Sequence, residues 1–403
     1  MIKRIEIQNY RSCFLTVFEP HPHLSVLIGP NGSGKTNLFN AITLLNKLSD
    51  ESIHYPHKER PTGQCKLKVW FEFEGKKAIL TAMIETYTDE NNNDEIVSSI
   101  ESWYLKDFTG SKEILNYPIY FFKNMGESFI KLINYKQTYS VNDMIIKIPD
   151  DAIKAFKLIY RYIENIKYYC VSKFTNPANC PVSFEIEENS LYRRIANTRG
   201  HEKFLYDLYS QYKAKNNKIY QQYIDIIGPS GIGLIDKIGF QKIPTSSMDI
   251  TVRSGGKTQK QRRDKILVIP QFKIGRNVLS PNQLSEGTFK TITLLFYLIT
   301  ETSSLLLLIE EPEVCIHHGL LTSILELIKD FSRDRQIVLS THSDFVLDHV
   351  APENVFKVSL IPKRGTEVTS IHKSKSRREL EALREYLDNI GSLGEYWKHG
   401  NLE

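Results

Sequence analysis

Gly29-Pro30-Asn31-Gly32-Ser33-Gly34-Lys35-Thr36 completes the pattern G-x-x-x-x-G-K-[ST] of a phosphate-binding loop, and this stretch decides the fold. An apolar run, Leu24 to Ile28, precedes it and has the character of a buried strand. After it, apolar residues recur at helical spacing from Leu38 to Leu48. The strand, loop and helix that the motif requires are therefore all predicted.

The residue types in this loop explain how it would hold a nucleotide. Glycines allow successive backbone N–H groups to turn towards an anion, and the N-terminus of the following helix adds partial positive charge. Lys35 is expected to reach the β- and γ-phosphates, and the Thr36 hydroxyl is expected to ligate Mg²⁺. The expected contacts to the nucleotide are Asn31, Gly32, Ser33, Gly34, Lys35, Thr36 and Asn37.

A second apolar run, Ser303 to Ile309, is typical of a strand buried on both faces of a parallel sheet, and it ends in acidic residues. Carboxylates at the end of a buried strand are costly unless they face a cation or a polarised water. We therefore assign Glu310 to the Mg²⁺ shell and Glu311 to the water that attacks the γ-phosphate. The alternative is an acidic helix start, and Glu313 fits that ordinary role.

A third strand is predicted from Gln336 to Leu339, and the polar residues Ser340-Thr341-His342-Ser343 follow it. Open α/β sheets bind ligands at such strand ends. His342 is therefore a candidate γ-phosphate contact, although a lone histidine after a strand is also a common structural residue.

The segment Leu284-Ser285-Glu286-Gly287-Thr288 precedes an apolar helix, so that Ser285 lies at a helix N-terminus suited to an anion. The phosphate loop has a helix of its own far upstream. A second helix start of this kind is explained if Ser285 and Gly287 complete the nucleotide site of another subunit.

Together these motifs resemble the ABC-type ATPases of the chromosome-maintenance, RecF and OLD (overcoming lysogenization defect) group. The opening Ile5 to Ser12 supports the resemblance, because its Arg11 matches an arginine that reaches the phosphates in such ATPases. The resemblance implies an α/β fold, an ABC-type ATPase head with a mixed sheet core, and the residue pattern of the middle of the chain adds an antiparallel β subdomain and a helical insertion. It also implies a head-to-head dimer around two ATP molecules, or a higher oligomer of such dimers, in which Lys35, Glu311 and His342 catalyse hydrolysis.

Two departures from the pattern point to one branch of this group. Ser-Glu-Gly-Thr replaces the Ser-Gly-Gly-Gln or Ser-Gly-Gly-Glu of transporters and chromosome-maintenance proteins, and Glu310 stands where those have Asp. Both departures are similar to the OLD-related branch, many of whose members are ATPase parts of bacterial phage-defence systems.

Composition bounds the class of protein. The 403 residues are 41% hydrophobic and 25% charged, which is enough for one large or two moderate cores. The net charge of +5 is too small to require a nucleic-acid partner. We see no apolar run of the roughly 20 residues that span a membrane, no export signal, and five cysteines without metal spacing. We therefore expect a cytoplasmic protein with no membrane partner.

The chain is expected to divide into residues 1–135, the N-terminal half of the head, residues 136–240, a mainly helical insertion, and residues 241–403, the C-terminal half. Alternation from residue 66 to about 135 predicts antiparallel sheet, broken by a solvated loop at Asp89 to Glu95. Helices are predicted at Asp150 to Asn165 and at Glu202 to Ile227, and a strand is predicted at Ile166 to Val171. The polar pair Ser172-Lys173 after that strand is a candidate nucleotide contact, although the role of Lys173 stays open.

Two basic stretches are candidate nucleic-acid contacts. Arg253 to Lys265 carries six basic residues against one acid, which suits phosphate contacts on a flexible loop but also an ordinary solvated hairpin tip. His372 to Arg378 is also basic, but Ser376 and Glu379 form a capping box that starts a helix through Leu387. A turn at Pro362 to Thr366 is expected to join two strands.

The segment after His342 is too short for the metal-dependent nuclease domain of OLD-type nucleases, which needs on the order of a hundred residues. We therefore expect an ATPase subunit that controls a separately encoded effector, such as a nuclease, as in two-component defence systems of the Septu or PARIS kind. One alternative is a RecF-like repair ATPase that clamps DNA. Another is a nucleotide-gated scaffold with little turnover.

Overall fold

The computed structural model describes residues 1–49, 63–73, 75–88, 94–106, 119–122, 138–141, 144–147, 150–170, 176–187, 200–252, 258–300 and 305–399. The chain forms two compact units. The first unit, here called the nucleotide unit, comprises Met1–Tyr169, Ser303–Glu311 and Leu327–Glu403. The second, here called the signature unit, comprises Cys170–Thr302 and Pro312–Glu326.

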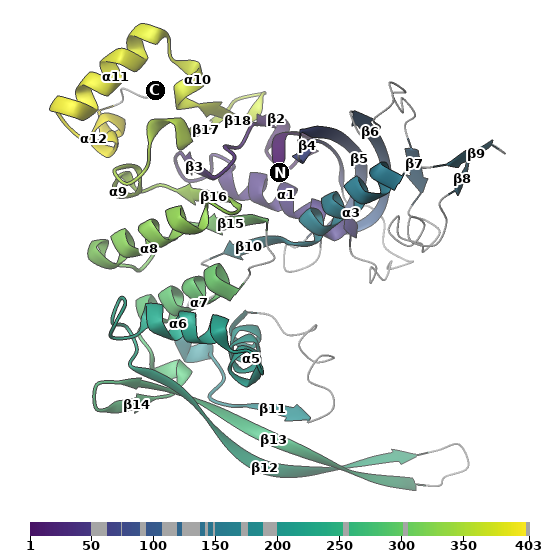
Figure 1. The fold of residues 1–403 in the computed structure, drawn as a ribbon, viewed down its shortest axis with the longest axis vertical. Coiled ribbons are helices and arrows are strands. Elements are labelled where there is room, and N and C mark those ends of the chain that lie inside the picture. Colours follow the sequence, from purple (N-terminus) through teal and green to yellow (C-terminus); the bar gives the residue numbers. More distant parts are fainter. Residues whose placement is uncertain are drawn as a thin grey trace. The chain divides into compact units, whose positions relative to one another are not determined.

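An antiparallel sheet of the nucleotide unit has the strand order β2-β1-β4-β5-β6-β7 (Figure 1). Its strands are β1 (Ile2–Tyr10), β2 (Cys13–Phe18), β4 (Gly63–Phe73), β5 (Lys76–Thr88), β6 (Asp94–Lys106) and β7 (Ile119–Phe122). Leu67, Val69 and Phe71 of β4 are buried, as the alternation of the sequence predicts. A separate pair, β8 (Thr138–Val141) and β9 (Met144–Lys147), is also antiparallel.

The second sheet of this unit has the order β10-β15-β16-β3-β17-β18 and carries the motifs. Its strands are β3 (Leu24–Ile28), β10 (Ile166–Cys170), β15 (Leu306–Glu310), β16 (Gln336–Thr341), β17 (Val355–Ile361) and β18 (Gly365–Ser370). Strands β15, β16, β3 and β17 pair in parallel, whereas β18 pairs antiparallel with β17. The sheet is therefore mixed, and the predicted α/β fold is confirmed.

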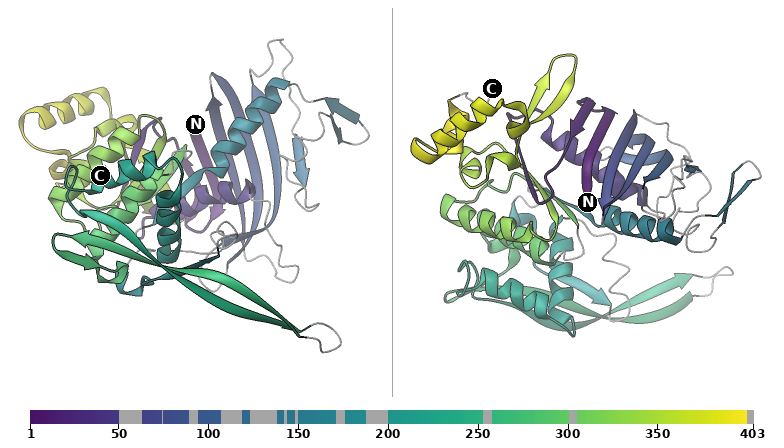
Figure 2. Two further views of the ribbon diagram at one scale, coloured as in Figure 1. Left: turned by 60° about the horizontal axis from the view of Figure 1, so that its bottom comes forward. Right: turned by 45° about the horizontal axis from the view of Figure 1, so that its top comes forward.

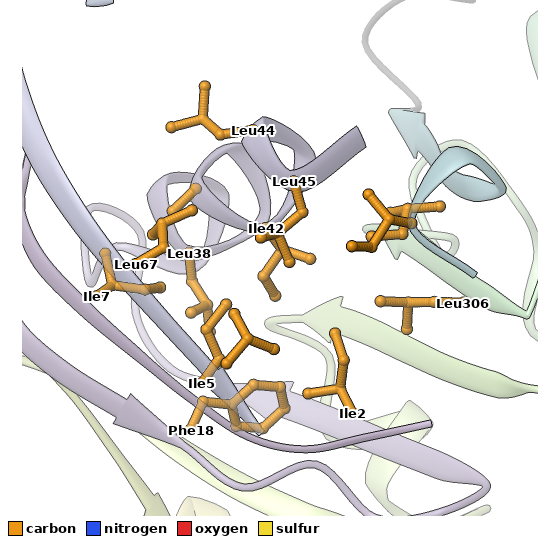
Figure 3. Packing of buried hydrophobic residues seen from close by; sticks show 14 of the residues in the cluster. Ile2, Ile5, Ile7, Phe18, Leu38, Ile42, Leu44, Leu45, Leu67 and Leu306 are labelled. Atoms are coloured by element: carbon orange, nitrogen blue, oxygen red, sulfur yellow. The ribbon is translucent and has the colours of Figure 1, made fainter. Parts of the chain in front are cut away.

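The core of this unit joins both sheets to the helix that follows the phosphate loop. Helix α1 (Lys35–Ser49) contributes Leu38, Ile42 and Leu45, which pack in one cluster with Ile5 of β1 and Leu306 of β15 (Figure 3). Helix α3 (Asp150–Glu164) adds its own buried side chains to the same cluster. Because these side chains are close-packed, the start of α1 is held fixed relative to the strand ends.

The signature unit combines helices with a second antiparallel sheet of order β11-β13-β12, in which β14 pairs with β13. The strands are β11 (Phe184–Glu187), β12 (Lys237–Val252), β13 (Thr258–Ile274) and β14 (Asn277–Leu279), and the helices are α5 (Gly200–Lys213), α6 (Lys218–Ile227) and α7 (Glu286–Thr300). Phe204 and Tyr223 meet Phe296 of α7 edge to face, with ring centroids 5.5 and 5.3 Å apart. Figure 2 shows β12 and β13 as a long twisted ribbon.

The remaining helices follow the acidic strand end. Helix α8 (His318–Phe331) begins in the signature unit and ends in the nucleotide unit. The others are α9 (Asp344–Leu347), α10 (Ile371–Ser374), α11 (Arg377–Asn389) and α12 (Leu393–Lys398), and short 3₁₀ turns span Pro177–Asn179, Pro281–Gln283 and Pro352–Asn354. The predicted capping box of Ser376 and Glu379 is confirmed. In the part of the chain that the structure describes, no helix is both long and apolar enough to cross a membrane.

Several expected boundaries were wrong. The helix predicted at Glu202 to Ile227 is two helices, because residues 214–217 leave the helical conformation at Asn216 and Asn217, which have low helix propensity. The acidic loop includes Asp94 and Glu95, which instead pair with β5 in strand β6. For Asp94 and Glu95, pairing with β5 decides the structure against their local preference for a loop.

The structure of the basic stretch and the bounds of strands β15 and β16 also differ from expectation. Residues 258–265 of the basic stretch are strand β13, since they pair in register with β12, while residues 253–257 lie outside the described part. Strand β15 begins only at Leu306 and includes Glu310, and β16 continues through Thr341 because it has a partner on each side. The candidate pair Ser172-Lys173 lies outside the described residues.

Candidate nucleotide site

The phosphate loop connects β3 to α1, and its backbone adopts conformations that need glycine. Gly32 has φ +81° and Gly34 has φ +102°, in the region that side-chain-bearing residues rarely adopt. The Lys35 ammonium donates hydrogen bonds to the carbonyls of Gly29 at 2.8 Å and Pro30 at 3.1 Å, and the side chain is buried. Asn31 and Thr36 are exposed at the rim of the loop.

A chain of hydrogen bonds holds the back of the loop. The Thr366 hydroxyl of β18 donates to the carbonyl of Ser33 at 3.1 Å, which uses its only proton. The Ser12 hydroxyl therefore donates to Thr366 at 2.8 Å, and the Asn37 amide donates to Ser12 at 2.7 Å. A Cβ on Gly34 would lie 2.0 Å from the Thr366 hydroxyl, so this contact also requires glycine. Sequence reasoning missed Ser12 and Thr366.

The acidic strand end lies next to the loop. Because β15, β16 and β3 are parallel, with Glu310 opposite Ser340 and Thr341 opposite Ile28, their carboxyl ends share one edge. The Thr36 hydroxyl donates a hydrogen bond to one carboxylate oxygen of Glu310. The Tyr168 hydroxyl of β10 donates to the other at 2.5 Å.

Tyr168 is a third residue that sequence reasoning missed. Its ring meets Phe39 of α1 edge to face, with centroids 5.8 Å apart, which fixes the hydroxyl beside Glu310. The predicted strand at Ile166 to Val171 was the only sequence signal near it.

The oxygens of Thr36 and Glu310 suit Mg²⁺, a hard cation that takes one or two protein oxygens together with phosphate oxygens and water. Within the described ranges, no group of three or more His, Cys, Asp or Glu side chains is arranged to hold a metal ion by itself. A site built from Thr36, Glu310 and nucleotide phosphates is consistent with both observations.

Glu311 and His342 form a pair at the same sheet edge. Glu311 has φ +46° and its N–H donates to the Ser340 carbonyl at 2.9 Å, so the backbone turns sharply after β15. The Nδ1 atom of His342 lies 3.4 Å from a Glu311 carboxylate oxygen. The His342 side chain is 46% exposed and the Glu311 side chain is 31% exposed, so both are accessible to water.

Arg11 lies in the two-residue turn between β1 and β2, with φ +49°. Its side chain is exposed, and the guanidinium lies 5.6 Å from the centroid of the Tyr10 ring. Its neighbour Ser12 makes the contacts to the phosphate-loop network described above.

Ser285 and Gly287, the predicted contacts to the nucleotide of a second subunit, lie in the signature unit. The exposed Ser285 caps α7, since its hydroxyl accepts from the N–H of Thr288 at 3.2 Å and its carbonyl accepts from the N–H of Phe289 at 2.9 Å. Gly287 is required by packing, because a Cβ there would lie 2.5 Å from the carbonyl of Cys315.

A buried cation supports this helix start. Lys290 is 2% exposed, and its ammonium lies 2.7 Å from a carboxylate oxygen of Glu286 and 3.4 Å from the Cys315 sulfur. The hydrogen bond from Lys290 lowers the pKa of the Glu286 carboxyl below its ordinary value. The second residue of Ser-Glu-Gly-Thr therefore has a structural partner within its own unit.

Comparison with known proteins agrees with the motif set. The family described as AAA ATPase domain matches residues 1–347. The DNA double-strand break repair Rad50 ATPase of Methanopyrus kandleri is 50% identical over 44 residues, which cover 11% of this chain and 5% of that protein. The DNA replication and repair protein RecF of Desulforamulus reducens is 42% identical over 41 residues, which cover 10% of this chain and 11% of that protein. The matched stretches are thus a small part of these relatives.

Solved structures of SMC heads are also similar. The SMC head bound to the C-winged helix domain of ScpA is 13% identical, with a TM-score of 0.49, and the match covers 93% of this chain and 98% of that chain. The SMC head domain from Thermotoga maritima is 12% identical, with a TM-score of 0.41, over 92% of this chain and 98% of that chain.

Proposed function

The chain belongs to the AAA ATPase domain family, and from this premise we propose that it binds ATP with Mg²⁺ on the phosphate loop and hydrolyses it. The observation that carries the proposal is the shared carboxyl edge of β3, β15 and β16. At this edge the phosphate loop, the Glu310 carboxylate and the pair of Glu311 and His342 are neighbours.

Binding uses the loop and the start of α1. The backbone N–H groups of the loop and the N-terminus of α1 receive the β- and γ-phosphates, and Lys35 adds a positive charge to them. Thr36 and Glu310 hold Mg²⁺, and Tyr168 orients the Glu310 carboxylate through its second oxygen. When bound, Mg²⁺ neutralises charge on the phosphates.

Hydrolysis uses the exposed pair. Glu311 accepts the proton of the attacking water, since its carboxylate is open to solvent at the edge where the γ-phosphate is held. His342 contacts the γ-phosphate and, being 3.4 Å from Glu311, keeps that carboxylate directed at the same point.

A second copy of the chain completes the site. Ser285 is exposed at the N-terminus of a 15-residue helix, where an anion is favoured, and Gly287 lies in the first turn of the same helix. In a head-to-head dimer, as the resemblance to ABC-type ATPases implies, Ser285 and Gly287 of one copy meet the γ-phosphate held by the other.

The biological effect of the ATPase depends on a second protein. We propose that ATP-dependent closure of the dimer controls a separately encoded effector such as a nuclease, in bacterial anti-phage defence. Its binding surface lies on residues 136–240 or after Val350, outside the ATP sandwich. The short matches to RecF favour a second candidate, a repair ATPase that clamps DNA. Co-purification of a nuclease-type protein favours the first, and ATP-dependent retention on DNA without an effector favours the second.

The variant Glu311→Gln tests the mechanism. It should bind ATP as wild type does, lose turnover and accumulate closed dimers in Mg-ATP, as measured by crosslinking and light scattering. Glu353→Gln, at an exposed glutamate outside the site, is the matched control and should behave as wild type. Normal turnover by Glu311→Gln would show that hydrolysis does not need the Glu311 carboxylate.

Complementation tests the shared site. Lys35→Ala and Ser285→Arg subunits should each be inactive alone and should recover one working site in each mixed dimer. If the mixture stays inactive although mixed dimers are present, catalysis within a single copy is the better account.

A further inference from the structure

Helix α9 begins two residues after His342, so its position determines that of His342. Only Ser343 separates His342 from Asp344, the first residue of α9. The N–H of Ser343 donates to the hydroxyl of Thr341 at 3.0 Å, and Thr341 is the buried last residue of β16. The imidazole therefore projects from a short connection between a fixed strand and a four-residue helix.

Helix α9 is too short to be stable by itself and depends on the groups that pack against it. Val346 and Leu347 anchor one side of it in the core. On its polar side, Asp344 and Asp348 carry carboxylates that face helix α12, which lies beside α9 (Figure 1).

The contact of α12 with α9 is close and specific. The N–H of Gly394 donates to the Asp348 carboxylate at 2.7 Å, and Lys398 forms an ion pair with Asp344. A Cβ on Gly394 would lie 2.5 Å from the carbonyl of Asp344, so only glycine allows this approach. The hydrogen bond from Lys398 also lowers the pKa of the Asp344 carboxyl. These contacts of α12 with α9 are here called the α9 clamp.

We propose that Gly394 and Lys398 are positioning residues for His342, acting through the α9 clamp. When the contacts of the α9 clamp are formed, α9 holds the His342 imidazole beside Glu311. When these contacts are broken, His342 loses its position beside Glu311, while the phosphate loop is unaffected. The consequence for turnover rests on the proposed role of His342 at the γ-phosphate. The clamp is then a point at which a partner bound near α12 changes hydrolysis without entering the nucleotide site.

Three variants and a control separate positioning from stability. Lys398→Ala and Gly394→Ala should lower kcat for ATP roughly tenfold, since small displacements of a reacting group are costly, with the Kd for ATP within about twofold of wild type. Lys398→Arg keeps the charge and should retain kcat. Arg377→Ala removes an exposed ion pair with Glu381 on α11 and should change neither quantity.

A double-mutant cycle identifies His342 as the group acted upon. In a His342→Ala background, Lys398→Ala should cause no further decrease in kcat, whereas independent structural damage would add to the loss. Additive losses, or wild-type kcat in both Lys398→Ala and Gly394→Ala while His342→Ala is slow, would overturn the proposal.

A spectroscopic measurement keeps the clamp testable if the proposed ATPase mechanism fails. With ¹³C-labelled histidine, the His342 resonance, assigned by its loss in His342→Ala, should shift or broaden in Lys398→Ala and Gly394→Ala and return in Lys398→Arg. An unchanged resonance refutes positioning whatever the turnover. A changed resonance with unaffected turnover in all variants, His342→Ala included, supports positioning and instead refutes the catalytic role of His342.

Discussion

The hydroxyl of Thr366 donates a hydrogen bond to the backbone carbonyl of Ser33, 333 positions earlier in the chain. It does so from β18, the edge strand of the mixed sheet, and it is fully buried there. The same hydroxyl accepts from Ser12, which accepts from Asn37 of α1. The phosphate loop is thus braced from behind by two segments that contribute nothing to its motif.

Thr366→Val should weaken ATP binding and lower stability. Valine keeps the shape of threonine but leaves the Ser33 carbonyl and the Ser12 hydroxyl without this partner, which costs about 1–3 kcal/mol for a buried group. Urea unfolding and ATP titration measure the two effects. Thr369→Val, at an exposed position of the same strand, is the matched control. Equal behaviour of the two variants would show that the brace is unimportant.

Tyr168→Phe should slow hydrolysis and raise the Mg²⁺ concentration needed for half-maximal turnover. The variant removes only the hydroxyl that orients Glu310, and loss of such an outer partner typically costs about 10–100-fold in metal affinity or activity. Tyr212→Phe, an exposed tyrosine of the signature unit, is the control. If Tyr168→Phe needs the same Mg²⁺ concentration for half-maximal turnover as wild type, the Tyr168 hydroxyl is not needed to orient the Glu310 carboxylate.

The sequence predicts those parts of the site in which the residues that bind the nucleotide follow one another in the chain. The glycines and Lys35 of the loop are a local pattern, and the strand before them is a local apolar run, so the loop could be found without the fold. Glu310 could be placed near Thr36 because the carboxyl ends of parallel strands share an edge.

Thr366 and Tyr168 could not be predicted in the same way. Each is an ordinary residue of a strand, and each acts only because sheet order brings its strand to the site. The turn near Thr366 is confirmed, since β17 and β18 pair antiparallel, but a turn pattern does not say which loop its strand will brace. Long-range pairing likewise turned part of the basic stretch into strand β13.

Glu286→Gln should lower stability at neutral pH, because it deprives the buried Lys290 of its carboxylate partner. Since Glu286 is 40% exposed and therefore partly screened, we expect a loss of roughly 1 kcal/mol. The folded-state pKa of Glu286 lies below 4.5, so its contribution is complete above that pH and is lost as the pH falls through the folded-state pKa.

Urea unfolding at several pH values measures this contribution. The difference between wild type and Glu286→Gln should be largest near pH 7 and should shrink as the pH falls below about 4.5. Glu381→Gln, which breaks an exposed pair with Arg377, should differ little from wild type at any pH. A difference that is independent of pH would mean that Glu286 acts through packing and not through charge.

The ribbon of β12 and β13 carries the basic stretch, and its register places Arg262 opposite Met248 and Arg263 opposite Ser247. If the chain binds duplex nucleic acid, we predict that this ribbon contributes phosphate contacts. Replacing Arg253, Lys257, Arg262 and Arg263 by Ser should then weaken binding and flatten its dependence on salt. The slope of log K against log salt should fall in magnitude by about 0.9 for each phosphate that the variant no longer neutralises.

The basic run before α11 supplies a control with the same change in net charge. Replacing Lys373, Lys375, Arg377 and Arg378 by Ser removes four positive charges from the end of α10 and the capped start of α11, and Lys373 already pairs with Glu19. Because a loss of net charge alone lowers affinity in both variants, the comparison isolates the phosphate contacts made by the ribbon. ATP turnover without nucleic acid should be the same in wild type and in the ribbon variant. If the slope of log K against log salt is the same for the two variants, the ribbon makes no phosphate contacts and is an ordinary solvated hairpin.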